Sequence, residues 1–197
     1  MGPIGVLALQ GDFREHLAIL DGLDIPNRKV KLAEDLFGIS GLIIPGGEST
    51  TIEKLSHING LYAPIRELIH AGMPVFGTCA GLILLANKIT DGILGQVGFG
   101  GLDVEVKRNA FGSQLDSFEA KIPFFDYEVA AAFIRAPIVL EARDSVAVVS
   151  RLVTGEIVGV QSGNILGISF HPELVGESRV HSHFIEMCKK VDFYAKL

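Results

Sequence analysis

The stretch at 74–85, PVFGTCAGLILL, constrains the fold more than any other part of the chain. Its apolar start at 74–76 is typical of a buried strand, and the apolar run at 82–86 is typical of a buried helix. Between them, GTCAG predicts a tight turn that places Cys79 at a helix N-terminus. Unpaired backbone N–H groups and the helix dipole stabilise a thiolate there, and the thiolate is the nucleophilic form of cysteine. The alternative is that Cys79 is a small buried apolar residue, the usual fate of a free cysteine.

Strand-like runs alternate with helical patterns through the first half of the chain. We expect strands at 4–9, 29–32, 41–45 and 74–76, and helices at 13–23, capped by Asp12, and at 50–70, broken at 59–60 and opened by a capping box of Thr50 and Glu53. This spacing predicts right-handed crossovers and an α/β fold, a doubly wound, mostly parallel sheet flanked by helices. Ligands bind outside the carboxyl ends of such strands. Gln10, Gly46-Gly47 and Cys79 fall at those ends, so three loops are expected to converge on one crevice.

The pattern changes after Asn87. We expect no helix in the glycine-rich segment 92–101, strands at 102–106 and 117–122, and a loop at 108–112. An apolar run follows at 129–135, then antiparallel strands at 147–151, 157–161 and 165–170, and a last helix from Ser178 to about Val191. The turns at 154–155 and 162–164 have hairpin chemistry. Because no linker interrupts the sequence, we expect one domain over 1–197 with a C-terminal antiparallel extension.

Three polar groups at strand ends form a candidate catalytic set: Cys79, His171 and Glu173. Pro172 fixes the backbone between the last two, so an extended segment can turn the carboxylate of Glu173 back toward the imidazole of His171. The set then contains the nucleophile, base and orienting carboxylate of acyl-transfer enzymes. Taken alone, His171 would be a surface-loop histidine and Glu173 a helix-initiating carboxylate; occurring together with the cysteine turn, they favour catalysis.

An oxyanion hole requires two N–H donors aimed at one point. Ala80, the residue after the candidate nucleophile, can supply one donor, and Gly47 in the glycine loop can supply the other. By default PGG at 45–47 is only a tight turn. We interpret it as functional because its strand is expected to lie next to the strand that leads to Cys79.

Composition excludes several function classes. The net charge of -6 and the lack of a basic run argue against nucleic-acid binding, and no apolar stretch reaches the length of a membrane span. We expect no signal peptide, and a cytoplasmic protein whose Cys79 and Cys188 stay reduced rather than form a disulfide. Cysteine and histidine do not cluster at ligand spacing, so we expect no metal and no cofactor.

Together, PGGES at 45–49, GTCAG at 77–81 and FHPE at 170–173 resemble the class I, triad-type glutamine amidotransferases. Within that family, three further motifs are similar to the glutaminase subunits of pyridoxal 5'-phosphate synthases: LALQGDFREH at 7–16, RNAFGSQLDSFE at 108–119 and FIRAP at 133–137. The resemblance runs from Ile4 to about Met187 and implies the flavodoxin-like class I glutaminase fold. Ser113 and the segment 175–177 depart from the family pattern.

The resemblance implies that Cys79 attacks the carboxamide of L-glutamine to give a γ-glutamyl thioester and ammonia. His171 would protonate the leaving amine and activate the hydrolytic water, and Glu173 would hold His171. The same resemblance implies that glutamine is bound by Gly47, Glu48, Ser49, Arg108, Ile134 and Arg135. An arginine suits the α-carboxylate and Glu48 the α-ammonium. Taken alone, these charges are ordinary surface ion pairs and a first-turn helix carboxylate.

The resemblance also implies a partner, a (β/α)8-barrel synthase subunit that receives the ammonia and builds pyridoxal 5'-phosphate within a large hetero-oligomer. Gln10 is the candidate partner-coupling residue, and the turn at 10–15 and the loop at 92–101 are the candidate docking segments. One alternative is a glutaminase subunit that serves a different ammonia acceptor, against which RNAFG and FIRAP argue. Another is a non-catalytic, redox-sensing thiol module, against which the intact His-Pro-Glu segment argues.

Overall fold

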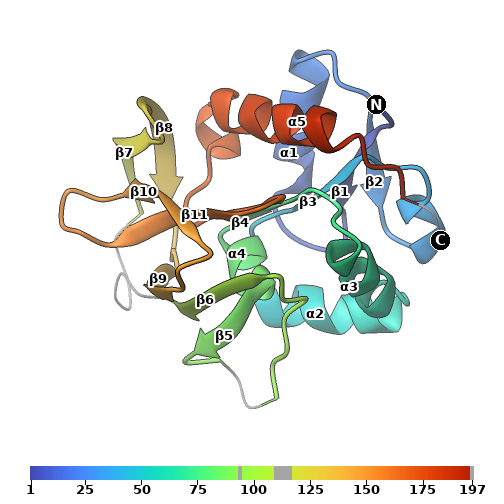
Figure 1. Ribbon diagram of the computed structural model, residues 1–197, viewed down its shortest axis with the longest axis horizontal. Coiled ribbons are helices and arrows are strands. Elements are labelled where there is room, and N and C mark those ends of the chain that lie inside the picture. The colour runs from blue at the N-terminus through green and yellow to red at the C-terminus, as the bar shows by residue number, and fades with distance from the viewer. Residues whose placement is uncertain (93–94, 109–116, 196–197) are drawn as a thin grey trace.

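The structure of the protein is a computed structural model that describes residues 1–92, 95–108 and 117–195. A ten-stranded mixed sheet runs in the order β2-β1-β3-β4-β12-β11-β9-β6-β5, with β10 paired to β11, and β7 and β8 form a separate hairpin (Figure 1). The strands of the large sheet are β1 (Ile4–Leu7), β2 (Asn27–Val30), β3 (Gly41–Ile44), β4 (Val75–Thr78), β5 (Ala86–Thr90), β6 (Leu102–Lys107), β9 (Ile138–Ala142), β10 (Ala147–Arg151), β11 (Ile157–Ser162) and β12 (Ile165–Ile168); the hairpin pairs β7 (Phe118–Phe124) with β8 (Tyr127–Phe133).

Helices cover both faces of the parallel half of the sheet, where β1, β3, β4 and β12 are buried along their whole length. One face carries α1 (Phe13–Gly22) and α5 (Arg179–Val191), and the other carries α2 (Ser49–Ile58), α3 (Tyr62–His70) and α4 (Ala80–Leu85), with the short 3-10 helices η1 (Ala33–Leu36) and η2 (Glu173–Val175) in connections. Apolar strands buried on both faces are what a doubly wound α/β sheet requires. The predicted fold class is confirmed.

The position of β12 differs from the prediction in one respect. The sequence pattern placed 165–170 among antiparallel strands, and β12 is indeed antiparallel to β11. It is also parallel to β4, with Ile168 opposite Thr78. All four residues of β12 are buried, so the strand needs a covered position inside the sheet rather than an edge. The antiparallel extension therefore joins the parallel sheet directly beside the strand that carries Cys79.

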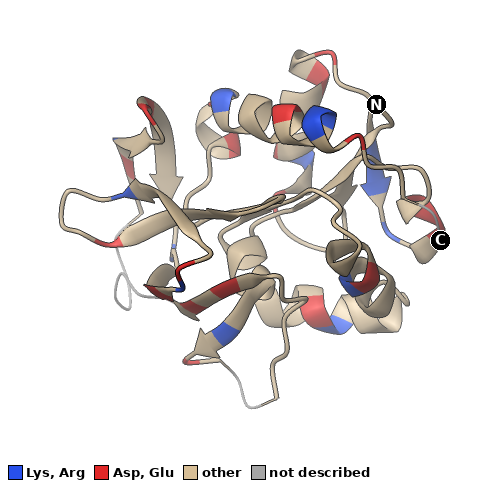
Figure 2. Cartoon of the chain, in the orientation of Figure 1, with Lys and Arg blue, Asp and Glu red and all other residues tan. Residues whose placement is uncertain are grey.

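Strands β5 and β9 were not predicted, and both pair with β6, the first parallel and the second antiparallel. The strands expected at 102–106 and 117–122 are present as β6 and β7, and most of the apolar run at 129–135 lies in β8. Of the loop expected at 108–112, all but Arg108 lies outside the described residues, and so does Ser113. Figure 2 shows that the central strands β3 and β4 carry no charged residue, as their sequences GLII and VFGT require.

Three predicted helix caps are wrong in detail. The second helix begins at Ser49, with Glu48 as its N-cap accepting a hydrogen bond from the backbone N–H of Thr50 at 3.4 Å. The carboxylate of Glu53 accepts from the backbone N–H of Val97 at 3.2 Å instead of closing a capping box. Asp12 and Ser178 occupy N-cap positions, but their side chains make no capping hydrogen bond. At Asp12 and at Glu53, a tertiary partner competes with the local cap. Within the described part of the chain, every helix is too short or too polar to cross a membrane.

Candidate active site

Cys79 lies on the predicted tight turn between β4 and α4, in a strained backbone conformation with φ 47° and ψ -100°. A non-glycine residue with positive φ costs on the order of 1–3 kcal/mol, and such strain gathers at functional sites. The backbone N–H of Cys79 donates to the carbonyl of Ile168 at 2.8 Å, which holds the turn against the end of β12. A Cβ on Gly81 would lie 2.1 Å from the carbonyl oxygen of Ile44, so this glycine lets α4 pack directly on β3.

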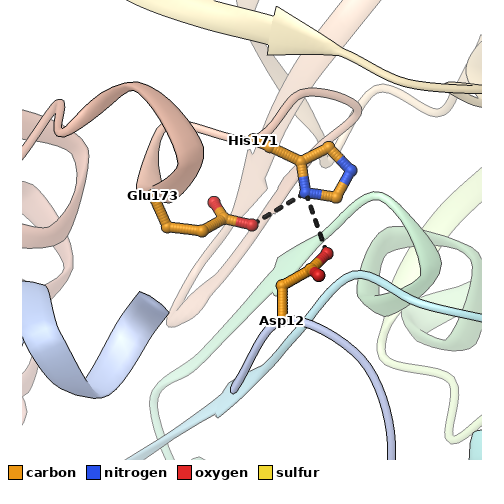
Figure 3. Close-up of side chains that lie close together, drawn as sticks. All are labelled: Asp12, His171 and Glu173. Atoms are coloured by element: carbon orange, nitrogen blue, oxygen red, sulfur yellow. Dashed lines mark hydrogen bonds and ion pairs between the residues drawn. The ribbon is translucent and has the colours of Figure 1, made fainter. Parts of the chain in front are cut away.

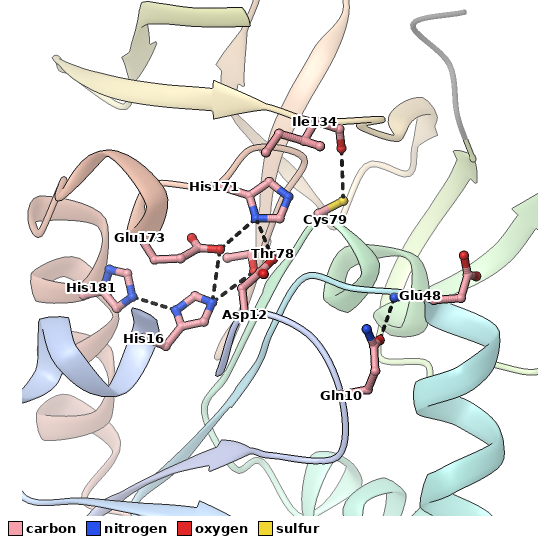
Figure 4. Close-up of polar contacts among 10 residues, drawn as sticks. All are labelled: Gln10, Asp12, His16, Glu48, Thr78, Cys79, Ile134, His171, Glu173 and His181. Carbon is pink, nitrogen blue, oxygen red and sulfur yellow. Dashed lines mark hydrogen bonds and ion pairs between the residues drawn. The ribbon is translucent and has the colours of Figure 1, made fainter. Parts of the chain in front are cut away.

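His171 follows β12 and is held on two sides. Its backbone N–H donates to the carbonyl of Ala132 in β8 at 2.8 Å, and its Nδ1 lies 2.8 Å from Oε1 of Glu173. The other side of the ring faces the sulfur of Cys79 (Figure 4). The predicted extended segment is wrong, because Pro172 is helical at φ -66° and opens η2. That tight turn brings the buried carboxylate of Glu173 back to the ring.

The charge state of His171 is set by its two partners. Burial disfavours the charged ring, yet the hydrogen bonds to Cys79 and Glu173 raise the pKa of His171 to about 10. The ring is therefore an imidazolium at neutral pH, and it lies beside the thiol of Cys79. Burial raises the pKa of the Glu173 carboxyl.

Asp12 is a second carboxylate at the same ring, and sequence reasoning assigned it only a capping role. Its Oδ2 lies 3.5 Å from Nδ1 of His171 (Figure 3). Ligand atoms of Asp12, His171 and Glu173 lie within 4.8 Å of one another, a spacing that a metal ion could also use. The 2.8 Å contact of Nδ1 with Glu173 is a charge-assisted hydrogen bond, which needs a proton on the nitrogen that a metal ion would replace. The geometry therefore fits a hydrogen-bonded triad better than a metal centre.

A pocket of about 400 Å³ opens beside Cys79, within the range of small-molecule sites. It gathers most of the residues that the sequence assigned to catalysis and glutamine binding. The lining residues are Asp12, Gly47, Glu48, Ser49, Cys79, Ile83, Arg108, Ile134, Arg135, His171 and Leu174. Glu173 lies behind His171 rather than on the wall, and Ala80 and Gln10 are not among the lining residues. Ile83 and Leu174 were missed, although Ile83 lies one helical turn after Cys79.

The glycine loop lies directly against the imidazole ring. A Cβ on Gly46 would come within 2.2 Å of Cε1 of His171, and Gly47 has a left-handed backbone with φ +148°. The loop is held by Gln10, whose Oε1 accepts from the backbone N–H of Glu48 at 2.8 Å (Figure 4). From the sequence, Gln10 was placed at a strand end beside the crevice and assigned to partner coupling. Its hydrogen bond to the glycine loop was not predicted.

Glu48 and Arg108, assigned to opposite ends of glutamine, form an ion pair with each other at 2.9 Å. The guanidinium of Arg108 also donates to Gln96 at 3.1 Å, and the side chain of Arg108 is only 11% exposed. Arg108 is therefore fixed in the pocket rim by its two partners, unlike a freely moving surface arginine. On the opposite rim, Arg135 has a left-handed φ of 46°, and the carbonyl of Ile134 accepts from the thiol of Cys79 at 3.9 Å.

The chain is similar to known proteins in both sequence and fold. The chain is 52% identical over 189 residues to the pyridoxal 5'-phosphate synthase subunit PdxT of Corynebacterium jeikeium, covering 95% of this chain and 97% of that protein. It is 50% identical to the PdxT of Dehalococcoides mccartyi, covering 94% and 97% of the two chains. A solved structure described as a glutamine amidotransferase superimposes with TM-score 0.89 at 43% identity, over 95% of this chain and 100% of that one.

A solved structure from Thermoplasma acidophilum, described as a putative GMP synthase protein, superimposes with TM-score 0.70 at 15% identity, covering 98% and 96% of the chains, which shows the shared fold alone. The model of the SNO glutamine amidotransferase family matches residues 6–190. The predicted resemblance is confirmed, and this chain belongs to the SNO glutamine amidotransferase family.

Proposed function

We propose that the chain is the glutaminase subunit of a pyridoxal 5'-phosphate synthase, which hydrolyses L-glutamine to L-glutamate and supplies the ammonia to a synthase subunit. The observation that carries the chemistry is the meeting of Cys79, His171 and Glu173 at one pocket. The pathway follows from relatives about half identical over nearly the whole chain, all of them named subunits of this synthase.

The reaction begins with attack of the Cys79 thiolate on the carboxamide carbon of glutamine. The carboxamide oxygen becomes an oxyanion, which accepts hydrogen bonds from the backbone N–H groups of Gly47 and Ala80. The imidazolium of His171 donates its proton to the leaving nitrogen, so the C–N bond breaks, ammonia departs and a γ-glutamyl thioester remains. The neutral ring then removes a proton from water, which attacks the thioester and releases glutamate. Throughout, Glu173 holds the ring and stabilises its charged form.

The pocket rim supplies groups for the zwitterionic end of the substrate. Arg108 and Arg135 provide cations for the α-carboxylate, and Glu48 provides an anion for the α-ammonium. The ion pair between Glu48 and Arg108 keeps both charges at the rim before the substrate arrives. Gly47, Ser49 and Ile134 complete the glutamine site.

The synthase subunit is a (β/α)8 barrel in this proposal, and the two subunits form a large hetero-oligomer in the cytoplasm. The whole chain serves as one glutamine amidotransferase domain. Gln10 couples the two subunits, because its side chain holds the backbone N–H of Glu48, the residue after Gly47. A partner that contacts the turn at 10–15 can therefore move the glycine loop that forms the oxyanion hole.

The decisive experiment measures glutamate release by the purified chain, titrated with the synthase subunit of a pyridoxal 5'-phosphate synthase. We expect hydrolysis that rises with the partner and saturates. A partner-independent rate would favour another ammonia acceptor, and no hydrolysis under any condition would favour a redox-sensing module.

Labelling with a chloroketone analogue of glutamine locates the nucleophile. We expect Cys79→Ala to abolish labelling and Cys188→Ala to retain it, because Cys188 is fully buried in α5 and burial raises the pKa of its thiol to about 12. Labelling that persists in Cys79→Ala would contradict the proposed chemistry.

A further inference from the structure

Behind the imidazole of His171, two further buried histidines extend the polar chain into the core. His16 comes from α1 and His181 from α5, and both are fully buried. Nε2 of His16 lies 3.5 Å from Oε1 of Glu173 and 3.2 Å from Oγ1 of Thr78. Nδ1 of His16 lies 2.8 Å from Nε2 of His181 (Figure 4). The order His171, Glu173, His16, His181 therefore runs from the pocket into the core, to buried residues of α1 and α5.

The hydrogen-bonding pattern fixes the direction of this chain. Burial lowers the pKa of His16 well below 6.5, so its ring is neutral and carries a single N–H. The hydrogen bond of this Nε2 is with Oγ1 of Thr78, and Oε1 of Glu173 lies 3.5 Å away as its other neighbour. Because an ionised carboxylate only accepts, we place the proton of His16 on Nε2, where it faces both oxygens. Nδ1 of His16 then accepts from Nε2–H of His181. In the described part of the chain, Nδ1 of His181 has no hydrogen-bond partner, and a bare nitrogen there costs less than an orphaned N–H.

We propose that His16 is a positioning residue for glutamine hydrolysis, donating from Nε2 to the Glu173 carboxylate on the side opposite His171, with His181 fixing its tautomer. This inference rests on the proposed function. His16 does not line the pocket, so it acts through Glu173 and not on the substrate.

Glu173 needs this second donor because its carboxylate is buried and has few other hydrogen-bond donors near it. Its Oε2 is buried without a hydrogen-bond partner among the described groups, and burial favours the protonated carboxyl. The remaining groups facing the pair are Asp12 from the loop before α1, at 3.5 Å from His171, and Thr78 from β4. Loss of the His16 donor destabilises the carboxylate, which weakens the imidazolium of His171 and with it the thiolate of Cys79.

The test contrasts His16→Gln with His16→Asn. The amide nitrogen of glutamine reaches the place of Nε2, whereas that of asparagine reaches only the place of Nδ1. With the synthase subunit present, we expect kcat to fall about 10- to 100-fold in H16N and only about threefold in H16Q, the range typical of outer-shell partners. KM for glutamine stays within about twofold, since ground-state binding is untouched.

A second readout is the pH profile of Cys79 alkylation by iodoacetamide in the isolated chain. Because H16N weakens the thiolate–imidazolium pair, we expect alkylation at neutral pH to slow several-fold and its profile to move to higher pH, while H16Q stays near wild type. The matched control is His183→Asn, two residues from His181 on the same helix, which removes a 2.9 Å contact with Gln161. It should leave kcat and the profile unchanged.

The inference is overturned by an unchanged profile and kcat in folded H16N, or by equal losses in H16Q and H16N. Thermal unfolding is measured first. If H16N does not fold, His181→Phe replaces it, since the new ring would lie beside Phe76. This change removes the hydrogen bond to Nδ1 of His16. An unchanged alkylation profile in H181F then overturns the tautomer-fixing role. Activity in Cys79→Ala would instead overturn the proposed function, so the two failures are distinguishable.

Discussion

The backbone N–H of Cys79 donates to the carbonyl of Ile168 at 2.8 Å, joining the end of β4 to the end of β12. The two strands are parallel and in register, so both point their carboxyl ends at the same crevice. His171 follows Ile168 by one short turn and therefore arrives beside the thiol. The sheet, rather than the loops, therefore sets the distance between Cys79 and His171, the pair that we propose as nucleophile and base, and it gives them rigid support.

Replacing Glu173 with glutamine should separate the geometric and the electrostatic roles of the carboxylate. Glutamine keeps the size but removes the charge that raises the pKa of His171 to about 10. At a pH below that pKa the ring is charged and can protonate the leaving amine, and at a higher pH it cannot. We therefore expect the alkaline limb of kcat/KM to move from near pH 10 toward lower pH, and kcat to fall roughly 100- to 10 000-fold.

Glu177→Gln is the matched control for this experiment. Its carboxylate pairs with Arg179 and accepts from the backbone N–H of Ala130, away from the ring. That change should reduce stability and leave the pH limb in place. An alkaline limb at the same pH in E173Q as in wild type would contradict the assignment of Glu173.

Acid stability should depend on His181. Burial lowers the pKa of His181 to about 4, whereas the unfolded histidine titrates near 6.5. As pH falls, the unfolded state therefore binds a proton at a higher pH than the folded state does. The stability that the neutral ring contributes is complete above pH 6.5 and is lost as the pH falls toward 4. The difference in unfolding free energy between wild type and His181→Phe should change by about 3 kcal/mol across this window, measured by urea denaturation. A difference independent of pH would show that the ring is not held neutral.

Local signals predicted the nucleophile turn, because strand, glycine-flanked cysteine and helix are adjacent along the chain. They also predicted the helix break near Asn59 and the position of β1. They did not predict that β12 pairs with β4, because an apolar run specifies burial and not the neighbouring strand.

For the same reason, the contact between the two buried histidines could not be predicted from the sequence. His16 and His181 are separated by 165 positions, and each resembles an ordinary helix residue in its own segment. Likewise, Asp12 looked like a helix cap, because its contact with His171 exists only after the sheet forms. Side chains that meet through non-local pairing leave no local pattern to recognise.

Gly46→Ala should damage catalysis through the ring rather than through the loop backbone. The new Cβ would lie 2.2 Å from Cε1 of His171, so the imidazole must move away from Cys79. Overpacking of this kind costs about 1–3 kcal/mol of stability, and a displacement near 1 Å costs roughly 100-fold in rate. Gly22→Ala is the control, since a Cβ there meets nothing within 4 Å and the helix gains about 0.5–1 kcal/mol. Equal kcat in the two variants would contradict the close approach.

Arg108→Met should weaken glutamine binding with a smaller effect on the chemical step. Methionine retains much of the apolar stem but removes the donors that hold Glu48 and that we propose to bind the α-carboxylate. Loss of one charge-assisted interaction is worth about 1.5–3 kcal/mol, so we expect KM to rise roughly 10- to 100-fold. As the control, Arg151→Met on β10 removes an exposed guanidinium that donates to the backbone carbonyl of Gly155, and KM should not change. Unchanged KM in R108M would remove Arg108 from the glutamine site.

Gln10→Ala should impair partner-stimulated hydrolysis more than it impairs folding. The side chain is partly exposed, and its Oε1 holds the backbone N–H of Glu48 at 2.8 Å, so its loss frees the loop that supplies the Gly47 donor. An oxyanion-hole donor is worth about 100- to 1000-fold in kcat, and a loosened donor should cost a large part of that. The stimulated kcat is measured with saturating synthase subunit, and the melting temperature is measured on the isolated chain. Gln10→Glu is the informative companion, because its carboxylate still accepts from Glu48 N–H and should retain the loop. If Q10A reaches the wild-type stimulated rate, the loop does not depend on this side chain, and the coupling between partner and oxyanion hole must use another contact.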